Sequence, residues 1–220
     1  RQLIGLVMSF IIATWLLLPP GREVWQDSWL SLLLGLGGGI IFVLPYTALF
    51  YRFAGKSLIE INEIVLGPIL GKVISVAFLW YIFHLGAGSV AFFNTLLSTA
   101  VFTMTPEYVL MISWLIVSIY ACKKGIEVLA RINEILVPAT VFLIFTTVLL
   151  VLNVFDVENF LPLWDYPVRE LLWAGYATMT FPFGQSIVFA MILPFLHRRE
   201  QGRGMIIVGL ASSAFILLIS

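Results

Sequence analysis

Residues 171–197 read LLWAGYATMTFPFGQSIVFAMILPFLH, a run without Asp, Glu, Lys or Arg. The run is longer than the roughly 20 mostly apolar residues that a helix needs to cross a bilayer. Across the 220 residues, 61% are apolar and 11% are charged, whereas about 25% of residues are charged in ordinary globular proteins. Six further uncharged runs separate the charged segments: 2–21, 28–51, 73–106, 108–122, 135–155 and 204–220. The pattern predicts an all-α polytopic membrane protein.

The seven runs predict seven membrane spans within a single transmembrane domain over 1–220. Lipid cannot satisfy backbone polar groups, so each span is expected to be helical. The run 73–106 exceeds one crossing, and its tail 99–105 is predicted to be a loop buried against the bundle. The chain opens on Arg1 and stops inside an apolar run, so we expect a fragment of a longer protein. The helices are expected near 3–19, 28–51, 73–98, 106–122, 134–153, 171–196 and 204–220.

The basic residues divide unequally between the two sides of the predicted domain. When the spans alternate in direction, only Arg22 and Arg169 fall on one side, together with seven acidic residues. The positive-inside rule then predicts a cytoplasmic N-terminus. The ten basic residues on the cytoplasmic side are Arg1, Arg52, Lys56, Lys72, Lys123, Lys124, Arg131, Arg198, Arg199 and Arg203.

Several function classes are excluded by what the chain lacks. Zero net charge, with no basic cluster beyond 197–199, predicts no nucleic-acid partner. A single cysteine, Cys122, permits no internal disulfide and no thiolate metal cluster. No pair of acids and no nucleophile with its base lies at membrane depth, so we expect neither an enzyme nor a bound metal or cofactor.

The predicted spans contain two features that favour a binding site. His84, near the centre of the third span, is the one ionisable group away from span ends, and such groups are costly in lipid. It could bind a polar substrate group or carry a proton, or it could be a neutral histidine bonded to a neighbouring helix. Pro182 and Gly184 interrupt the sixth span, and a helix broken at mid-membrane exposes backbone groups to a small zwitterion. A simple proline kink is the alternative.

Two further segments have predictable local structure. Ser57 and Glu60 form a capping box that opens a short helix, and this helix should stop at Gly67-Pro68 and lie along the interface. Glu127 and Arg131, four residues apart, can pair on one helix face. Gly35 and Gly39 have GxxxG spacing, for which packing inside the bundle and dimerisation are the two interpretations.

Five segments of the chain resemble the spore germination permease family. The GIEVLAR stretch, together with FPFG in the sixth span, is the most specific part of this resemblance. The segments are GREVWQDSWLSLL at 21–33, RFAGKSLIEINEIVLGPILG at 52–71, KKGIEVLARINEILVP at 123–138, FLPLW at 160–164 and FPFGQSIVFAMILP at 181–194.

The resemblance implies a B-type subunit of a nutrient germinant receptor, in the inner membrane of the spore. Such subunits are similar to amino acid/polyamine/organocation transporters, in which five-plus-five spans form an inverted repeat. The expected partners are an A-type membrane subunit, a C-type lipoprotein and a small nutrient such as an amino acid. Carried over by position, the ligand pocket comprises Ala13, Thr14, Trp15, His84, Gly88, Thr180, Phe181, Pro182, Phe183, Gly184 and Gln185.

The chain departs from the transporter pattern at two positions. The first span reads Ile12-Ala13-Thr14 at its centre, without a glycine break, and Gln185 stands where relatives often carry an acid. Both departures favour sensing of a nutrient over its active transport. The alternative is a proton-coupled amino acid permease that uses His84.

Overall fold

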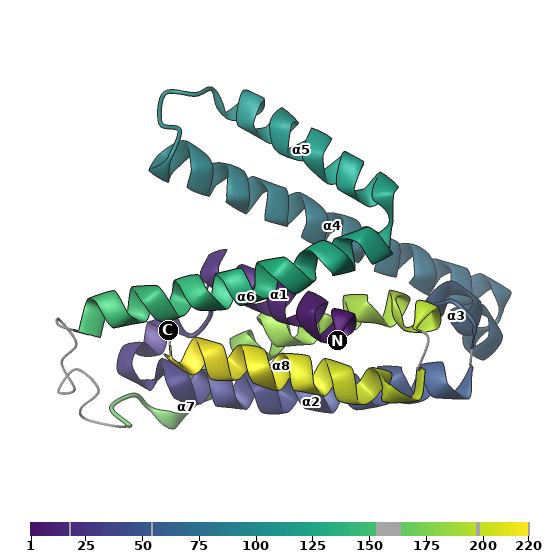
Figure 1. The fold of residues 1–220 in the computed structure, drawn as a ribbon. Helices are drawn as coiled ribbons and strands as arrows, with labels where there is room; N and C mark the ends of the chain where they lie inside the picture. The colour runs from purple at the N-terminus through teal and green to yellow at the C-terminus, as the bar shows by residue number, and fades with distance from the viewer. Residues whose placement is uncertain (18, 54, 153–163, 197–198, 220) are drawn as a thin grey trace. The chain divides into compact units, whose positions relative to one another are not determined.

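The described part of the chain consists of helices joined by short turns and loops, without a strand. Figure 1 shows the computed structural model, which describes all residues except 18, 54, 153–163, 197–198 and 220. The first four residues of the FLPLW motif and two residues of the basic cluster 197–199 therefore lie outside the described residues. Two compact units are formed, Arg1–Ala54 with Ile132–Ser220, and Gly55–Arg131, and each is described by itself.

Each of the seven predicted spans overlaps a helical segment. By length and composition, four described segments are suited to crossing a membrane: Arg22–Arg52, Pro68–Ala100, Ile126–Val151 and Gly202–Ile219. These segments confirm an all-α polytopic membrane protein. The elements are α1 (Gln2–Leu17), η1 (Arg22–Asp27), α2 (Ser28–Arg52), α3 (Leu58–Leu66), α4 (Pro68–Ala100), α5 (Glu107–Lys124), α6 (Ile126–Val151), α7 (Val168–Thr178), η4 (Met179–Phe183), η5 (Gly184–Met191), η6 (Leu193–Phe195), η7 (Arg199–Gln201) and α8 (Gly202–Ile219).

The first unit is organised around α2, which lies beside α8 in Figure 1 and also packs against α7, η4 and η5. A polar contact joins α2 to the start of α8. The Arg203 Nε–H donates to Thr47 Oγ1 over 2.9 Å, and the Arg203 backbone N–H donates to Tyr51 Oη over 2.9 Å. Thr47 is fully buried, so this contact anchors Arg203 to the interior of the unit. The sequence predicts Arg203 only as a loop residue between two spans.

Glycines allow α2 to approach the segment that follows α7. A Cβ on Gly35 would collide with the side chain of Thr178 and lie 2.9 Å from its carbonyl carbon, and one on Gly39 would lie 2.6 Å from Phe183 Cβ. Small residues at membrane helix contacts permit this close packing. The GxxxG spacing therefore serves packing inside the unit, as one of its two interpretations predicted.

The second unit confirms the predicted capping box. The backbone N–H of Ser57 donates to the Glu60 carboxylate over 2.7 Å, and the Glu60 N–H donates to Ser57 Oγ over 3.3 Å. Helix α3 stops at Leu66, and Gly67, with φ 81°, turns the chain into Pro68, the first residue of α4. A positive φ is costly for residues with a Cβ, so glycine suits this corner.

Two helix boundaries differ from the sequence predictions. Helix α4 begins at Pro68 rather than near 73, because proline suits the first helical turn, and α6 begins at Ile126 rather than near 134. Residues 101–105, predicted to be buried against the bundle, connect α4 to α5 with Met104 96% exposed. The burial of this loop against the bundle stays a prediction. The predicted ion pair of Glu127 and Arg131 is present at the start of α6.

Replacing Ser57 with alanine is expected to destabilise α3 by about 1 kcal/mol, because the first turn loses its side-chain cap. The hydrogen bond from the Ser57 backbone holds the pKa of Glu60 below its ordinary value, with the Ser57 hydroxyl and Lys56 contributing. A lowered pKa in the folded state stabilises α3 above the pKa of the unfolded chain, and this contribution disappears as pH falls through the folded pKa.

Hydrogen exchange of α3 amides at several pH values measures both effects. Ser57→Ala should lower the protection factors of the α3 amides at neutral pH, and acidification should lower them in the parent protein. Ser113→Ala is the matched control, since Ser113 is exposed on α5 and bonds only to the carbonyl of Val109. Equal exchange in the Ser57 and Ser113 variants would contradict the capping role.

Candidate ligand site at the broken helix

The sixth predicted span is broken where its sequence indicated. Helix α7 ends at Thr178, and Met179–Phe183 forms a π turn in which Phe181 has extended backbone angles, φ −138° and ψ 119°. A tighter 3-10 segment, η5, continues from Gly184. Pro182 has no N–H to donate, so regular α-helical bonding cannot continue through this turn. π turns occur frequently at functional sites.

Side chains of the break divide between the protein interior and its surface. Phe183 is fully buried against Gly39, and Pro182 is also buried. Thr180 is exposed, and its hydroxyl donates to the carbonyl of Tyr176 one turn earlier. Phe181 and Gly184 are half-buried. One face of the break is therefore fixed by packing, while the other face, with Thr180, is exposed.

A group of buried polar side chains lies directly behind the break. Tyr46, Gln185 and Ser186 each have an exposed fraction of 8% or less. The hydroxyls of Tyr46 and Ser186 face each other, but neither makes a hydrogen bond of normal geometry with the described residues. Buried polar groups without partners are rare in native proteins and require an explanation. A polar ligand or an ordered water at the break would provide the missing bonds.

The middle of α1 contacts the broken segment only in part. The rings of Phe10 and Phe189 pack edge to face, with centroids 5.6 Å apart. Thr14 is half-buried and its hydroxyl donates to the carbonyl of Phe10, whereas Ala13 is exposed. Trp15 lines a different cavity, of about 840 Å³, to which the residues of the break do not contribute. The place of Trp15 in the predicted ligand pocket stays a prediction.

His84 and Gly88 belong to α4 in the second unit, so their place in a common pocket with the break stays a prediction. The His84 side chain is exposed within the described structure, and no side-chain hydrogen bond of His84 is found there. A Cβ on Gly88 would meet nothing within 4 Å. Among the described residues, no three His, Cys, Asp or Glu side chains converge as metal ligands.

Sequence reasoning missed the role of Asp27. This carboxylate is fully buried and accepts hydrogen bonds from the backbone N–H groups of Trp164, Asp165 and Tyr166 over 3.1, 3.1 and 3.4 Å. It thereby fixes the segment that enters α7. An Asp just before an apolar run is typical of a helix cap, and the sequence does not indicate a partner 137 residues away.

Comparison with known proteins gives matches over the whole chain. A family model described as spore germination protein matches residues 1–220. Spore germination protein KB of Bacillus subtilis (strain 168) is 30% identical over 223 residues, which cover 100% of this chain and 60% of that protein. Protein YndE of the same organism is 23% identical over 93% of this chain and 57% of its own length. No solved structure matches the chain.

A third relative, spore germination protein B2 of the same organism, is 21% identical over 88% of this chain and 52% of its own length. The chain therefore spans a little over half the length of the curated relatives that it matches.

Proposed function

The chain belongs to the spore germination protein family, and from this premise we propose that it is the B-type membrane subunit of a nutrient germinant receptor. In this proposal, a small nutrient such as an amino acid binds at the broken helix. The observation that carries the proposal is the group of buried hydroxyl and amide side chains, Tyr46, Gln185 and Ser186, behind an interrupted span. These groups can bond to both ends of a zwitterion, since hydroxyls and amides donate and accept.

The proposed mechanism is a ligand-dependent shift between two arrangements of the broken helix. A ligand shifts such an equilibrium only by its different affinities for the two states. The glycine face of α2 supports a two-state element, because Gly35 and Gly39 hold Thr178 and Phe183 in contact with α2. A nutrient that bonds to Gln185 would stabilise one of the two arrangements of the broken helix. An A-type subunit and a C-type lipoprotein would then respond to the change.

Composition of the break favours sensing over active transport. Neither η4 nor η5 contains an Asp or Glu, and a carboxylate is the common proton or cation coupling group in pumps. In the proposed arrangement the protein lies in the inner spore membrane with its N-terminus in the cytoplasm. Proton-coupled uptake through His84 is the competing activity. Measuring whether a labelled amino acid accumulates against its gradient distinguishes uptake from sensing.

Binding of a panel of the common amino acids to the full-length protein, reconstituted with its partner subunits, tests the proposal. At least one amino acid should bind. Gln185→Leu should lower the affinity for this amino acid by about tenfold, because one buried hydrogen bond to a charged ligand is lost. Thr180→Val should also weaken binding. Thr146→Val is the matched control, since Thr146 is a half-buried residue of α6 whose hydroxyl likewise donates to a carbonyl one turn earlier.

Two outcomes would contradict the proposal. Unchanged affinity in both Gln185→Leu and Thr180→Val would remove the pocket from the broken helix. Accumulation of a labelled amino acid against its gradient in vesicles, abolished by His84→Gln, would instead establish the permease. Receptor subunits are expected to bind the nutrient without concentrating it.

A further inference from the structure

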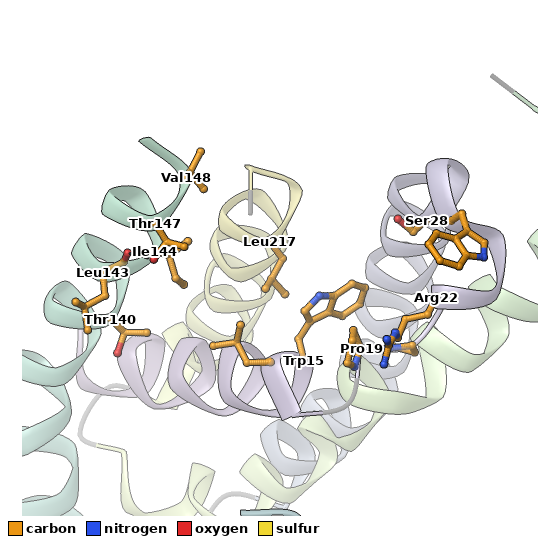
Figure 2. A pocket seen from close by; sticks show the side chains of 13 residues that line it. Trp15, Pro19, Arg22, Ser28, Thr140, Leu143, Ile144, Thr147, Val148 and Leu217 are labelled. Carbon is orange, nitrogen blue, oxygen red and sulfur yellow. Dashed lines mark hydrogen bonds between the residues drawn. The ribbon is translucent and has the colours of Figure 1, made fainter. Parts of the chain in front are cut away.

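A second cavity, of about 840 Å³, opens where α1 ends. Figure 2 shows side chains of α6 on one side and those near η1 on the other, with Trp15 and Leu217 between them. The α6 wall is apolar at Leu143, Ile144 and Val148 and hydroxylated at Thr140 and Thr147. The opposite wall is formed by Pro19, Pro20, Arg22, Trp25 and Ser28. The cavity thus combines a long apolar wall with one cation.

The short helix η1 holds Arg22 and Trp25 in place at this cavity. Val24 is buried in a cluster with Leu171 and Ala174, and Asp27 is bound to the backbone before α7. Between these two anchors, Trp25 has φ 35°, which is uncommon for a residue with a Cβ. Its indole is 74% exposed. The anchors therefore fix a backbone that presents Arg22 and Trp25 outward.

By the predicted spans, the end of the cavity that holds Arg22 and Trp25 lies at the boundary between lipid and water. The cavity lies at the last residues of α1, in the second half of α6 and near the end of α8. Trp side chains favour this boundary because they combine an apolar body with one polar N–H. The apolar wall of α6 belongs to a span with none of its most apolar window buried, so the cavity is continuous with surface suited to acyl chains.

Among the described residues that line this cavity, Arg22 is the one charged residue, and it favours an anionic head group there although acids outnumber basic residues on this side. By the sequence assignment, only Arg22 and Arg169 are basic on this side of the membrane, against seven acids. Arg169 also lines an apolar cavity, of about 560 Å³, together with Leu172, Trp173 and Tyr176. Both arginines therefore stand beside apolar space and aromatic rings. A guanidinium binds phosphate through two parallel hydrogen bonds.

We propose that the cavity at the end of α1 binds one anionic phospholipid, with its phosphate at Arg22 and an acyl chain along α6 and α8. Trp15 and Trp25 flank the glycerol region. A free nutrient anion fits less well, because it offers nothing to the wall formed by Leu143, Ile144 and Val148. The proposal concerns a site apart from the broken helix and does not depend on which nutrient binds there.

Native mass spectrometry of the full-length protein in mild detergent tests the proposal. Phosphatidylglycerol, added in equal amount to phosphatidylcholine, should be retained preferentially. Arg22→Gln should weaken phosphatidylglycerol retention by about fivefold, the effect of about one basic residue at an anionic membrane surface, and should leave phosphatidylcholine unchanged. Glu23→Gln is the matched control, since Glu23 is exposed on the same short helix and does not line the cavity.

Three outcomes would overturn the proposal: equal retention of both lipids by the parent protein, unchanged preference in Arg22→Gln, or displacement of phosphatidylglycerol by inorganic phosphate at millimolar concentration. The last result would identify a phosphate site in place of a lipid site. If Arg22→Gln does not fold, the lipid preference of the parent protein and of Arg22→Lys, which keeps the charge, still decides the matter. Trp25→Ala should also reduce retention.

Discussion

Replacing Gly35 with leucine is expected to destabilise the full-length protein by at least about 3 kcal/mol, at the upper end for overpacked cores. A Cβ at this position collides with Thr178 and reaches to 2.9 Å from its carbonyl carbon. Backbone cannot move aside as a flexible side chain can, so α2 and the end of α7 must separate. Thermal unfolding in detergent, together with the yield of folded protein, measures the loss.

Gly37→Leu is the matched control for this prediction. Gly37 lies two residues further along the same helix, and a Cβ there would meet nothing within 4 Å. The two variants add the same side chain with the same gain in helix propensity, so they differ only in what the side chain meets. Equal stability of the two variants would show that α2 does not pack against the broken helix in the native protein.

The helical architecture and the break were predictable because they depend on local signals. The uncharged runs indicated where the spans lie, and Pro182 with Gly184 indicated where the sixth span is interrupted. The capping box at Ser57 and Glu60 was predictable for the same reason, since its hydrogen bonds span only three residues. Backbone preferences of this kind act within one or two turns, and the sequence contains all of the information required.

Contacts between distant elements were not predictable to the same degree. The spacing of Gly35 and Gly39 indicated a close helix contact, but not that Thr178 and Phe183 fill it. The unpaired hydroxyls of Tyr46 and Ser186 become apparent only when α2 and η5 are brought together. The composition of residues 101–105 does not indicate what covers them, because apolar side chains in a membrane protein can face lipid as readily as protein.

The contact of Asp27 leads to the second large expected effect. Asp27→Ala is expected to destabilise the protein by about 2–4 kcal/mol, since hydrogen bonds to a charged group contribute about 1.5–3 kcal/mol each and the three bonds are not additive. The backbone N–H groups of 164–166 lose their acceptor, and the entry to α7 is no longer fixed to η1. Thermal unfolding and amide exchange at 164–166 report the two consequences separately.

Two asparagine variants test whether stability depends on the hydrogen-bonded carboxylate or on any acidic charge nearby: Asp27→Asn and Asp165→Asn. Asparagine at position 27 retains one acceptor oxygen, so Asp27→Asn should lie between the alanine variant and the parent protein. Asp165 accepts only a long bond of 3.3 Å from Gln26 at the surface, and its replacement should change stability by less than about 0.5 kcal/mol. Equal effects at positions 27 and 165 would contradict the role of Asp27. Because the segment that Asp27 holds leads directly into α7 and the break, loosening it should also weaken the proposed nutrient binding without altering any residue of the proposed pocket.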